Sequence, residues 1–287
     1  MKHVFRGRTT EWLLTTPSLL WLAIFFALPA GLILMAAFRP ADLHGGLGDG
    51  WSLAAVHALA DPSYPALWFR TLWLSLVATL ICLALALPAG YHLARLPRRR
   101  QGVILLLIVL PFLTNFLIRV FAWKTLLHPD GPLTRLLQNC GILSEDTLLL
   151  YNSGAVLAVL VYVHLPFALL PVYAAAERFD FCLLDAARDL GAGAWKRFWS
   201  VFLPGVGAGA GAGALLVLTG CLGQYVVPQL VGGTDNEMIG NRIVQRAFSD
   251  RNLPEAAALS GVLLIALLLV LMAQARKRRH SAREAGL

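Results

Sequence analysis

Six long apolar blocks, separated by short polar segments, dominate the pattern along this chain of 287 residues. They cover about residues 17–38, 68–94, 102–127, 153–176, 204–227 and 254–273. Each block is long enough to cross a bilayer as a helix, which takes roughly 20 apolar residues. None alternates apolar and polar residues with the period of two that marks a membrane β-barrel. The pattern predicts an all-α integral membrane protein with six transmembrane helices, built as a single domain over residues 1–287.

The charges indicate which side of the membrane each polar segment faces. Only 14% of the residues are charged and 58% are hydrophobic, yet the net charge is +8. The basic residues gather in four clusters, at residues 2–8, 95–100, 178–197 and 276–283. With six spans all four clusters fall on one side, and an excess of Lys and Arg marks the cytoplasmic side. We therefore expect both termini in the cytoplasm. Because the charges flank the spans, we expect contacts with membrane lipid and none with nucleic acid.

Residues 177–203 form the one long polar segment expected inside the cell, called here the 177–203 loop. Its apolar positions Leu183, Leu184, Ala187 and Leu190 have helical spacing. Gly191 follows at once and predicts a helix C-terminus in the left-handed region, which glycine favours. Small side chains in this short helix would allow another surface to approach its backbone closely.

The same loop carries a motif that resembles the cytoplasmic loop of ABC-importer permeases. The family pattern is Glu-Ala-Ala, three residues, Gly, nine residues, Ile, any residue and Leu-Pro. Here Asp185 stands for Glu and Val201 for Ile, and the spacing is intact. The resemblance implies a type I ABC importer permease of the bacterial inner membrane, with a multi-pass chain. It implies an ATPase-coupling loop made by Asp185, Ala186, Ala187, Arg188, Asp189, Gly191, Leu203 and Pro204.

The resemblance also implies partners. They are two cytoplasmic ABC ATPase subunits, a second permease subunit that is often a paralogue, and a periplasmic substrate-binding protein. The chain contains no G-x-x-x-x-G-K-[ST] sequence, so it has no P-loop to hold a nucleotide. ATP is therefore expected on the partner ATPase, with no cofactor or metal on this chain. The four cysteines are scattered and form no C-x-x-C pair.

Further segments resemble the spermidine/putrescine branch of these permeases. They include Pro111–Arg119, which reads Pro-Phe-Leu-Thr-Asn-Phe-Leu-Ile-Arg, together with Leu165–Phe167 and Leu230–Gly233. Within the third apolar block, Asn115 and Arg119 are four residues apart and would share one face of a continuous helix. Polar groups at membrane depth usually face a bundle interior or a water-filled cavity. We therefore take Asn115, Arg119, Gln224 and Tyr225 as candidates for the substrate pathway. Alternatively, Arg119 complements the dipole at the end of its helix.

The solute itself stays open at this stage. A polyamine is a polycation, yet no span carries a carboxylate near its middle. Amino-acid derivatives, opines, other small organic cations and inorganic ions therefore remain alternatives. An intramembrane enzyme is disfavoured because Ser75, Ser260 and His164 sit in no recognisable catalytic motif. A secondary transporter is disfavoured by the lack of intramembrane acids for ion coupling.

Overall fold

The protein is described here from a computed structural model that covers residues 15–42, 46–144 and 147–284, with side chains up to residue 276. In these ranges the regular structure is helical, apart from one isolated bridge between Ala41 and Leu47. The chain divides into two units, Met1–Tyr64 with Arg242–Leu287, and Pro65–Asn241.

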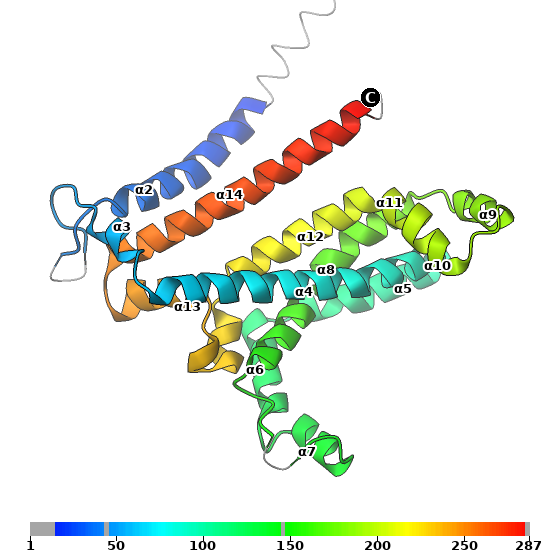
Figure 1. Ribbon diagram of the computed structural model, residues 1–287, viewed down its shortest axis with the longest axis horizontal. Coiled ribbons are helices and arrows are strands. Elements are labelled where there is room, and N and C mark those ends of the chain that lie inside the picture. Colours follow the sequence, from blue (N-terminus) through cyan, green and yellow to red (C-terminus); the bar gives the residue numbers. More distant parts are fainter. Residues whose placement is uncertain (1–14, 43–45, 145–146, 285–287) are drawn as a thin grey trace, which may run out of the picture. The chain divides into compact units, whose positions relative to one another are not determined.

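The first unit is built on two long helices. The N-terminal one runs over Thr15–Ala36 and includes the π-helical turn η1 (Ala23–Ala27) and α2 (Leu28–Ala36). The other is α14 (Leu253–Glu284), which packs against α2 (Figure 1). Near the start of α14, Ala257 and Ala258 are buried together with Ala37, which follows α2, and Ala55 of the short helix after it. The short helices α3 (Ala54–Ala58) and η6 (Gln245–Ser249) complete the unit.

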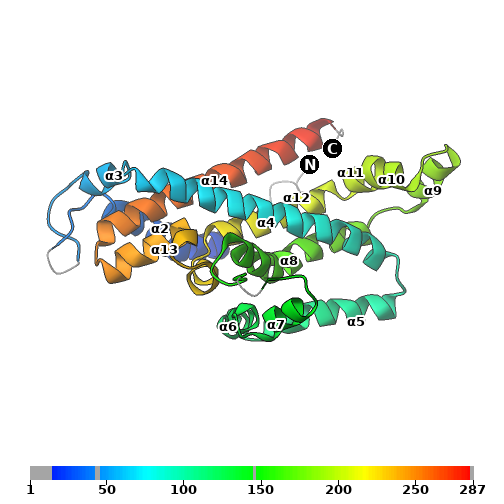
Figure 2. The same ribbon diagram turned by 60° about the horizontal axis from the view of Figure 1, so that its bottom comes forward.

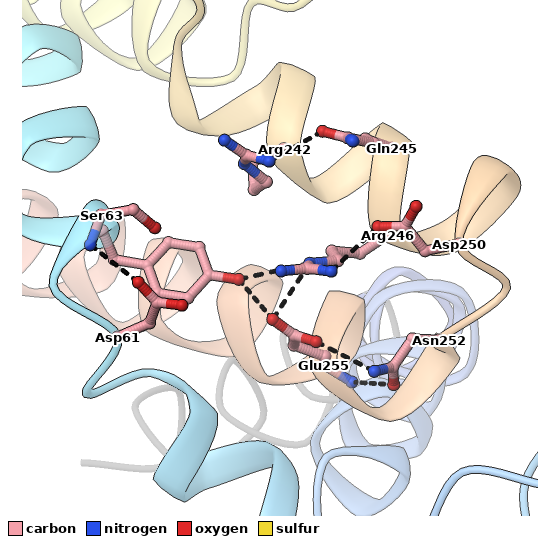
Figure 3. Close-up of polar contacts among 9 residues, drawn as sticks. Asp61, Ser63, Arg242, Gln245, Arg246, Asp250, Asn252 and Glu255 are labelled. Atoms are coloured by element: carbon pink, nitrogen blue, oxygen red, sulfur yellow. Dashed lines mark hydrogen bonds and ion pairs between the residues drawn. The ribbon is translucent and has the colours of Figure 1, made fainter.

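A buried polar cluster ties three segments of the first unit together (Figure 3). The Glu255 carboxylate accepts a hydrogen bond from the Tyr64 hydroxyl and pairs with Arg246 Nε at 3.1 Å. Arg246 also pairs with Asp250 at 3.0 Å. Asn252 precedes α14, and its Oδ1 accepts the backbone N–H of Glu255 at 3.2 Å, as an N-cap does. The cluster thus fixes where α14 begins relative to Tyr64.

The second unit is organised around α8 (Ser153–Glu177), the most buried helix of this part of the chain. The α12 helix (Gly207–Leu222) lies along it (Figures 1 and 2). A Cβ on Gly209 would lie 2.5 Å from the Pro171 carbonyl oxygen, and one on Gly213 would lie 2.9 Å from that of Ala168. The glycine-rich start of α12 therefore serves close helix packing, as small-xxx-small faces do in membranes.

The remaining elements of the second unit connect these helices. They are α4 (Ser63–Ala94), α5 (Arg98–Val109), η2 (Leu110–Leu113), α6 (Phe116–Leu127), α7 (Pro132–Asn139), α9 (Cys182–Asp189), α10 (Ala194–Arg197), η3 (Phe198–Phe202), α11 (Leu203–Gly205), η4 (Pro228–Gly232), η5 (Thr234–Asn236) and α13 (Ile239–Val244). The α4 helix begins in the first unit and α13 ends there.

The structure confirms a multi-span helical chain but corrects two of the expected spans. Among the described residues, four helices are long and apolar enough to cross a membrane, and the number rises to six if two bent pairs each count as one span. The block 102–127 is not one helix, because α5 and η2 end at Leu113 and α6 begins at Phe116 after a bend of 91°. The block 204–227 bends by 74° near Val206, and its long helix α12 ends at Leu222.

Candidate functional site

The 177–203 loop lies beyond the N-terminal end of α12 and contains α9, a turn, α10 and η3 (Figure 2). Leu184 is the only fully buried residue of α9. It packs with Ala176, Phe202 and Val206, which are also buried. Leu184 therefore anchors α9, while most of the remaining helix surface is exposed.

An aromatic cluster fixes the base of the loop. The Tyr91 ring of α4 meets Phe202 edge-on at 4.9 Å and Phe181 at 6.0 Å. Arg95 donates to the Tyr91 hydroxyl at 2.7 Å and lies over the Phe181 ring at 5.5 Å. Gly205 allows this packing, because a Cβ there would lie 2.3 Å from the Phe179 ring. The loop therefore leaves the membrane domain from a rigid base.

The turn after α9 is a Schellman motif, as the position of Gly191 predicts. Gly191 has φ +82°. Its N–H donates to the Arg188 carbonyl at 2.9 Å, and the Ala192 N–H donates to the Ala187 carbonyl at 3.0 Å. These are the two bonds that define the motif. The glycine thus sets the direction in which the chain leaves α9 toward α10.

The predicted coupling residues fall on two elements, with Asp185 to Gly191 on α9 and its C-terminal turn and Leu203 and Pro204 on α11. Asp185 and Arg188 lie in the first and last turns of α9, where their charges complement the helix dipole. Ala186 and Asp189 are exposed, and Ala187 is half-buried. Leu203 and Pro204 open α11, with Leu203 half-buried and Pro204 exposed.

Two large apolar side chains beside these residues are exposed to an unusual degree. Leu190 is 89% exposed and Trp195 is 75% exposed. Leu183 and Trp199 are exposed as well. Apolar groups gathered on a polar loop indicate an interface with another protein or with the membrane surface.

Cys182 begins α9 and is exposed. The nearby Asp180 carboxylate raises the pKa of this thiol. The thiol is therefore held more strongly in its neutral form, which is the less reactive form.

A cleft of ≈ 520 Å³ opens between η2, α6, α8 and α12 in the second unit. Most of its lining is apolar or aromatic, and Arg119 supplies the only charged group of that lining. The lining residues are Phe112, Phe116, Arg119, Val163, His164, Phe167, Leu216, Thr219, Gly220 and Gln224. We call this the Arg119 cleft.

The break between η2 and α6 shapes this cleft. The chain bends by 91° between the helices before and after residues 114–115. The Arg119 guanidinium carbon, on the far side of this break, lies 4.7 Å from the centre of the Phe112 ring. It also lies 6.0 Å from the Phe116 ring. Arg119 lies near the start of α6, so the alternative interpretation that it complements a helix C-terminus is wrong.

Asn115 does not share a helix face with Arg119, because it precedes α6. Its side-chain oxygen accepts the Leu117 N–H at 2.9 Å and caps the helix. Gln224 and Tyr225 follow the end of α12 in a non-helical segment. Gln224 lines the Arg119 cleft, whereas Asn115 and Tyr225 are absent from its lining. Two of the four predicted pathway residues therefore meet in one place.

Sequence reasoning did not predict the aromatic part of the cleft. Phe112 and Phe167 meet edge-on at 5.6 Å. His164 bonds to the Leu160 carbonyl through Nδ1 at 2.9 Å, as a packed histidine does. Phenylalanines are common in apolar spans, so no local signal separated these from core residues.

The sequence and the fold both have known relatives. Residues 83–279 match the family described as "Binding-protein-dependent transport system inner membrane component". The chain is 35% identical over 259 residues to the spermidine/putrescine transport system permease protein PotB of Escherichia coli, covering 90% of this chain and 94% of that one. PotB of Haemophilus influenzae is 37% identical over 259 residues, covering 90% of this chain and 91% of that one.

This chain belongs to the family of binding-protein-dependent transport system inner membrane components. The permease is therefore a multi-pass inner-membrane transport subunit of an ABC importer and not an enzyme. Two crystal structures of bacterial alginate ABC transporters share its fold. Their TM-scores are 0.69 and 0.68 at 17% and 16% identity, and each covers 97% of this chain and 99% or 98% of the other. The second holds an alginate-bound periplasmic protein.

Proposed function

We propose that this permease moves polyamines such as spermidine and putrescine from a periplasmic binding protein into the cytoplasm. The observation that carries the proposal is the identity of 35% and 37% with permeases named for these solutes. The match extends over 90% of the chain and includes the transmembrane region that a solute must cross.

The 177–203 loop supports a docking role for ATPase subunits. The α9 helix is anchored by its one fully buried residue, Leu184. Leu183 on the helix and Leu190 at its C-cap are exposed near Arg188. The chain carries no nucleotide-binding loop, so the energy of ATP must come from another subunit. We propose two cytoplasmic ATPases, one on this permease and one on a second permease subunit, with the periplasmic binding protein on the opposite side.

Both termini are proposed to lie in the cytoplasm, with the 177–203 loop. The support comes from the four basic clusters, which occupy one side if both bent pairs cross the membrane. A single cysteine at Asp49 should then react with a membrane-impermeant maleimide from outside intact spheroplasts. One at Arg99 should react only after lysis, and labelling with the opposite sidedness would contradict the topology.

The Arg119 cleft is the proposed place where the solute meets this subunit. Its position between α6, α8 and α12 puts Arg119 and Gln224 on one cavity within the membrane domain. Gln224 offers both a donor and an acceptor to a solute that has left water. Asn115 is proposed to position Arg119 by capping the start of α6. Tyr225 is proposed to position Gln224, its neighbour in the chain.

A second candidate solute is a small oxyanion. The charged group in the lining of the Arg119 cleft is a cation, and its Nε and Nη1 are buried without a hydrogen-bond partner among the described residues. Arginine donors of this kind suit carboxylate or phosphate oxygens.

Uptake by a strain without its own polyamine import separates these candidates. The strain should express this permease with its ATPase, its partner permease and its binding protein. We expect uptake of labelled spermidine that excess putrescine suppresses and that molybdate or sulfate does not. ATP-dependent uptake of an oxyanion, with none of spermidine, would overturn the polyamine proposal.

A further inference from the structure

The Arg119 cleft combines a cation with the faces of aromatic rings. The Arg119 guanidinium carbon lies 4.7 Å from the centre of the Phe112 ring and 6.0 Å from that of Phe116. Phe167 packs edge-on against Phe112 at 5.6 Å and adds a third ring to the same cleft. Aromatic faces attract cations because their quadrupole places negative charge above and below the ring.

Hydrogen bonds hold this arginine poorly. Its Nε and Nη1 atoms are buried and have no hydrogen-bond partner among the described residues. The lining of the cleft contains no carboxylate. The histidine of the lining, His164, uses Nδ1 for the Leu160 carbonyl. The ring faces are therefore the principal attraction that keeps the guanidinium in place, and its departure would break no bond at Nε or Nη1.

The same arrangement fits the head of a polyamine. An ammonium group and a guanidinium are both monovalent cations that bind aromatic faces, so they can occupy one site in turn. The repulsion between two cations in a cleft of low polarity prevents them from sharing it. Gln224 supplies an amide oxygen that can accept a hydrogen bond from an ammonium N–H.

We propose that Phe112 and Phe116 form a cation site that Arg119 fills at rest and that an ammonium group of the solute takes during transport. The inference rests on the proposed function, since it needs a solute with ammonium groups. It accounts for passage of a polycation through a cleft that lacks acids. Contact with ring faces replaces part of the lost hydration, and the returning guanidinium displaces the solute before it is trapped.

A double-mutant cycle tests competition for the rings directly. The first change is Arg119→Gln, which removes the resident cation but keeps a polar side chain. The second replaces Phe112 by trifluorophenylalanine, which keeps the ring shape and weakens its negative face. Equilibrium binding of labelled spermidine is measured on the detergent-purified complex of both permeases and the ATPases, without binding protein.

We expect Arg119→Gln to raise spermidine affinity at least threefold, because the rings become vacant. Ring fluorination should then lower the spermidine affinity of the Arg119→Gln complex. In the unaltered complex it weakens the attraction of the ring for Arg119 and for the solute alike, so the affinity should change little. Trifluorophenylalanine at Phe121, an exposed ring on α6 outside the cleft lining, serves as the matched control.

If the unaltered complex imports spermidine in a parallel assay, two results would overturn this inference and leave the proposed function standing. One is an unchanged or lower affinity in the Arg119→Gln complex. The other is an effect of ring fluorination that is equal in the two backgrounds. If the unaltered complex imports no polyamine, the proposed function is overturned and the inference falls with it.

Discussion

Replacing Gly191 by a β-branched residue should uncouple transport from ATP hydrolysis while leaving the membrane domain intact. The glycine has φ +82°, and a Cβ at this position would meet no atom within 4 Å. The cost of Gly191→Val or Gly191→Thr is therefore purely one of backbone conformation. A left-handed backbone costs an L residue about 1–2 kcal/mol.

The loop can accept that strain or relax. Relaxation gives up the hydrogen bonds from the Gly191 and Ala192 amides, at 2.9 and 3.0 Å. Each such bond contributes about 0.5–1.5 kcal/mol, so both routes have similar costs. A loss of one to two kcal/mol lowers the relative population of the native turn by roughly 5- to 30-fold. The chain would then leave α9 in another direction, and Leu190 and α10 would be displaced from the surface that they form with α9.

The assay compares spermidine uptake with ATP hydrolysis stimulated by the loaded binding protein in proteoliposomes. Gly193→Thr is the matched control, because Gly193 also has open space around its Cβ but has φ −64° and ψ 164°. We expect Gly191→Thr to lose most uptake per ATP and Gly193→Thr to retain it. Gly191→Asn should recover part of the loss, since asparagine tolerates the left-handed region. Equal uptake by the two threonine variants would refute this reasoning.

Three further predictions concern other parts of the second unit. Asn115→Leu should slow uptake because it removes a helix cap worth about 1 kcal/mol, whereas Asn115→Asp should keep the cap and the uptake. Slow uptake by the Asp variant would instead indicate contact between Asn115 and the solute. Gly209→Ala should lower the melting temperature of the purified complex, because its Cβ would lie 2.5 Å from a carbonyl oxygen of α8, whereas Gly207→Ala meets nothing within 4 Å; equal melting of the two variants would contradict the packing argument. Asp180→Asn should speed alkylation of Cys182 at pH 7 by lowering the pKa of the thiol, which the carboxylate now raises, and an unchanged rate in this permease would show that the carboxylate does not act on it.

The sequence was a good guide where local chemistry decides the structure. Gly191 follows a short helical pattern, and both the left-handed turn and the exposed helix α9 were found where expected. The glycine-rich start of α12 is a local pattern of the same kind, and Gly209 and Gly213 pack closely against α8. In each case a few neighbouring residues carry the information.

The sequence was a poor guide where a long apolar block contains a break between two helices. Residues 102–127 are apolar on average, yet Thr114 is extended and Asn115 caps a new helix after it. A polar residue at membrane depth suggests a pathway, so the cap was read as a contact with the solute. The sequence also gave no sign that Arg119 and Gln224 share a cleft, because that depends on how α6 and α12 pack with α8.

The central claim is that an ATPase subunit docks on α9 and that ATP hydrolysis drives transport through this contact. A photo-crosslinking amino acid at Leu190, which is 89% exposed, tests it most directly in the assembled complex. The same amino acid at Ile142, which is also exposed but lies beyond α7, serves as the control. The account predicts that the probe at Leu190 crosslinks to the ATPase chain and that the probe at Ile142 does not. A crosslink from Leu190 to the periplasmic binding protein, or to lipid alone, would contradict it.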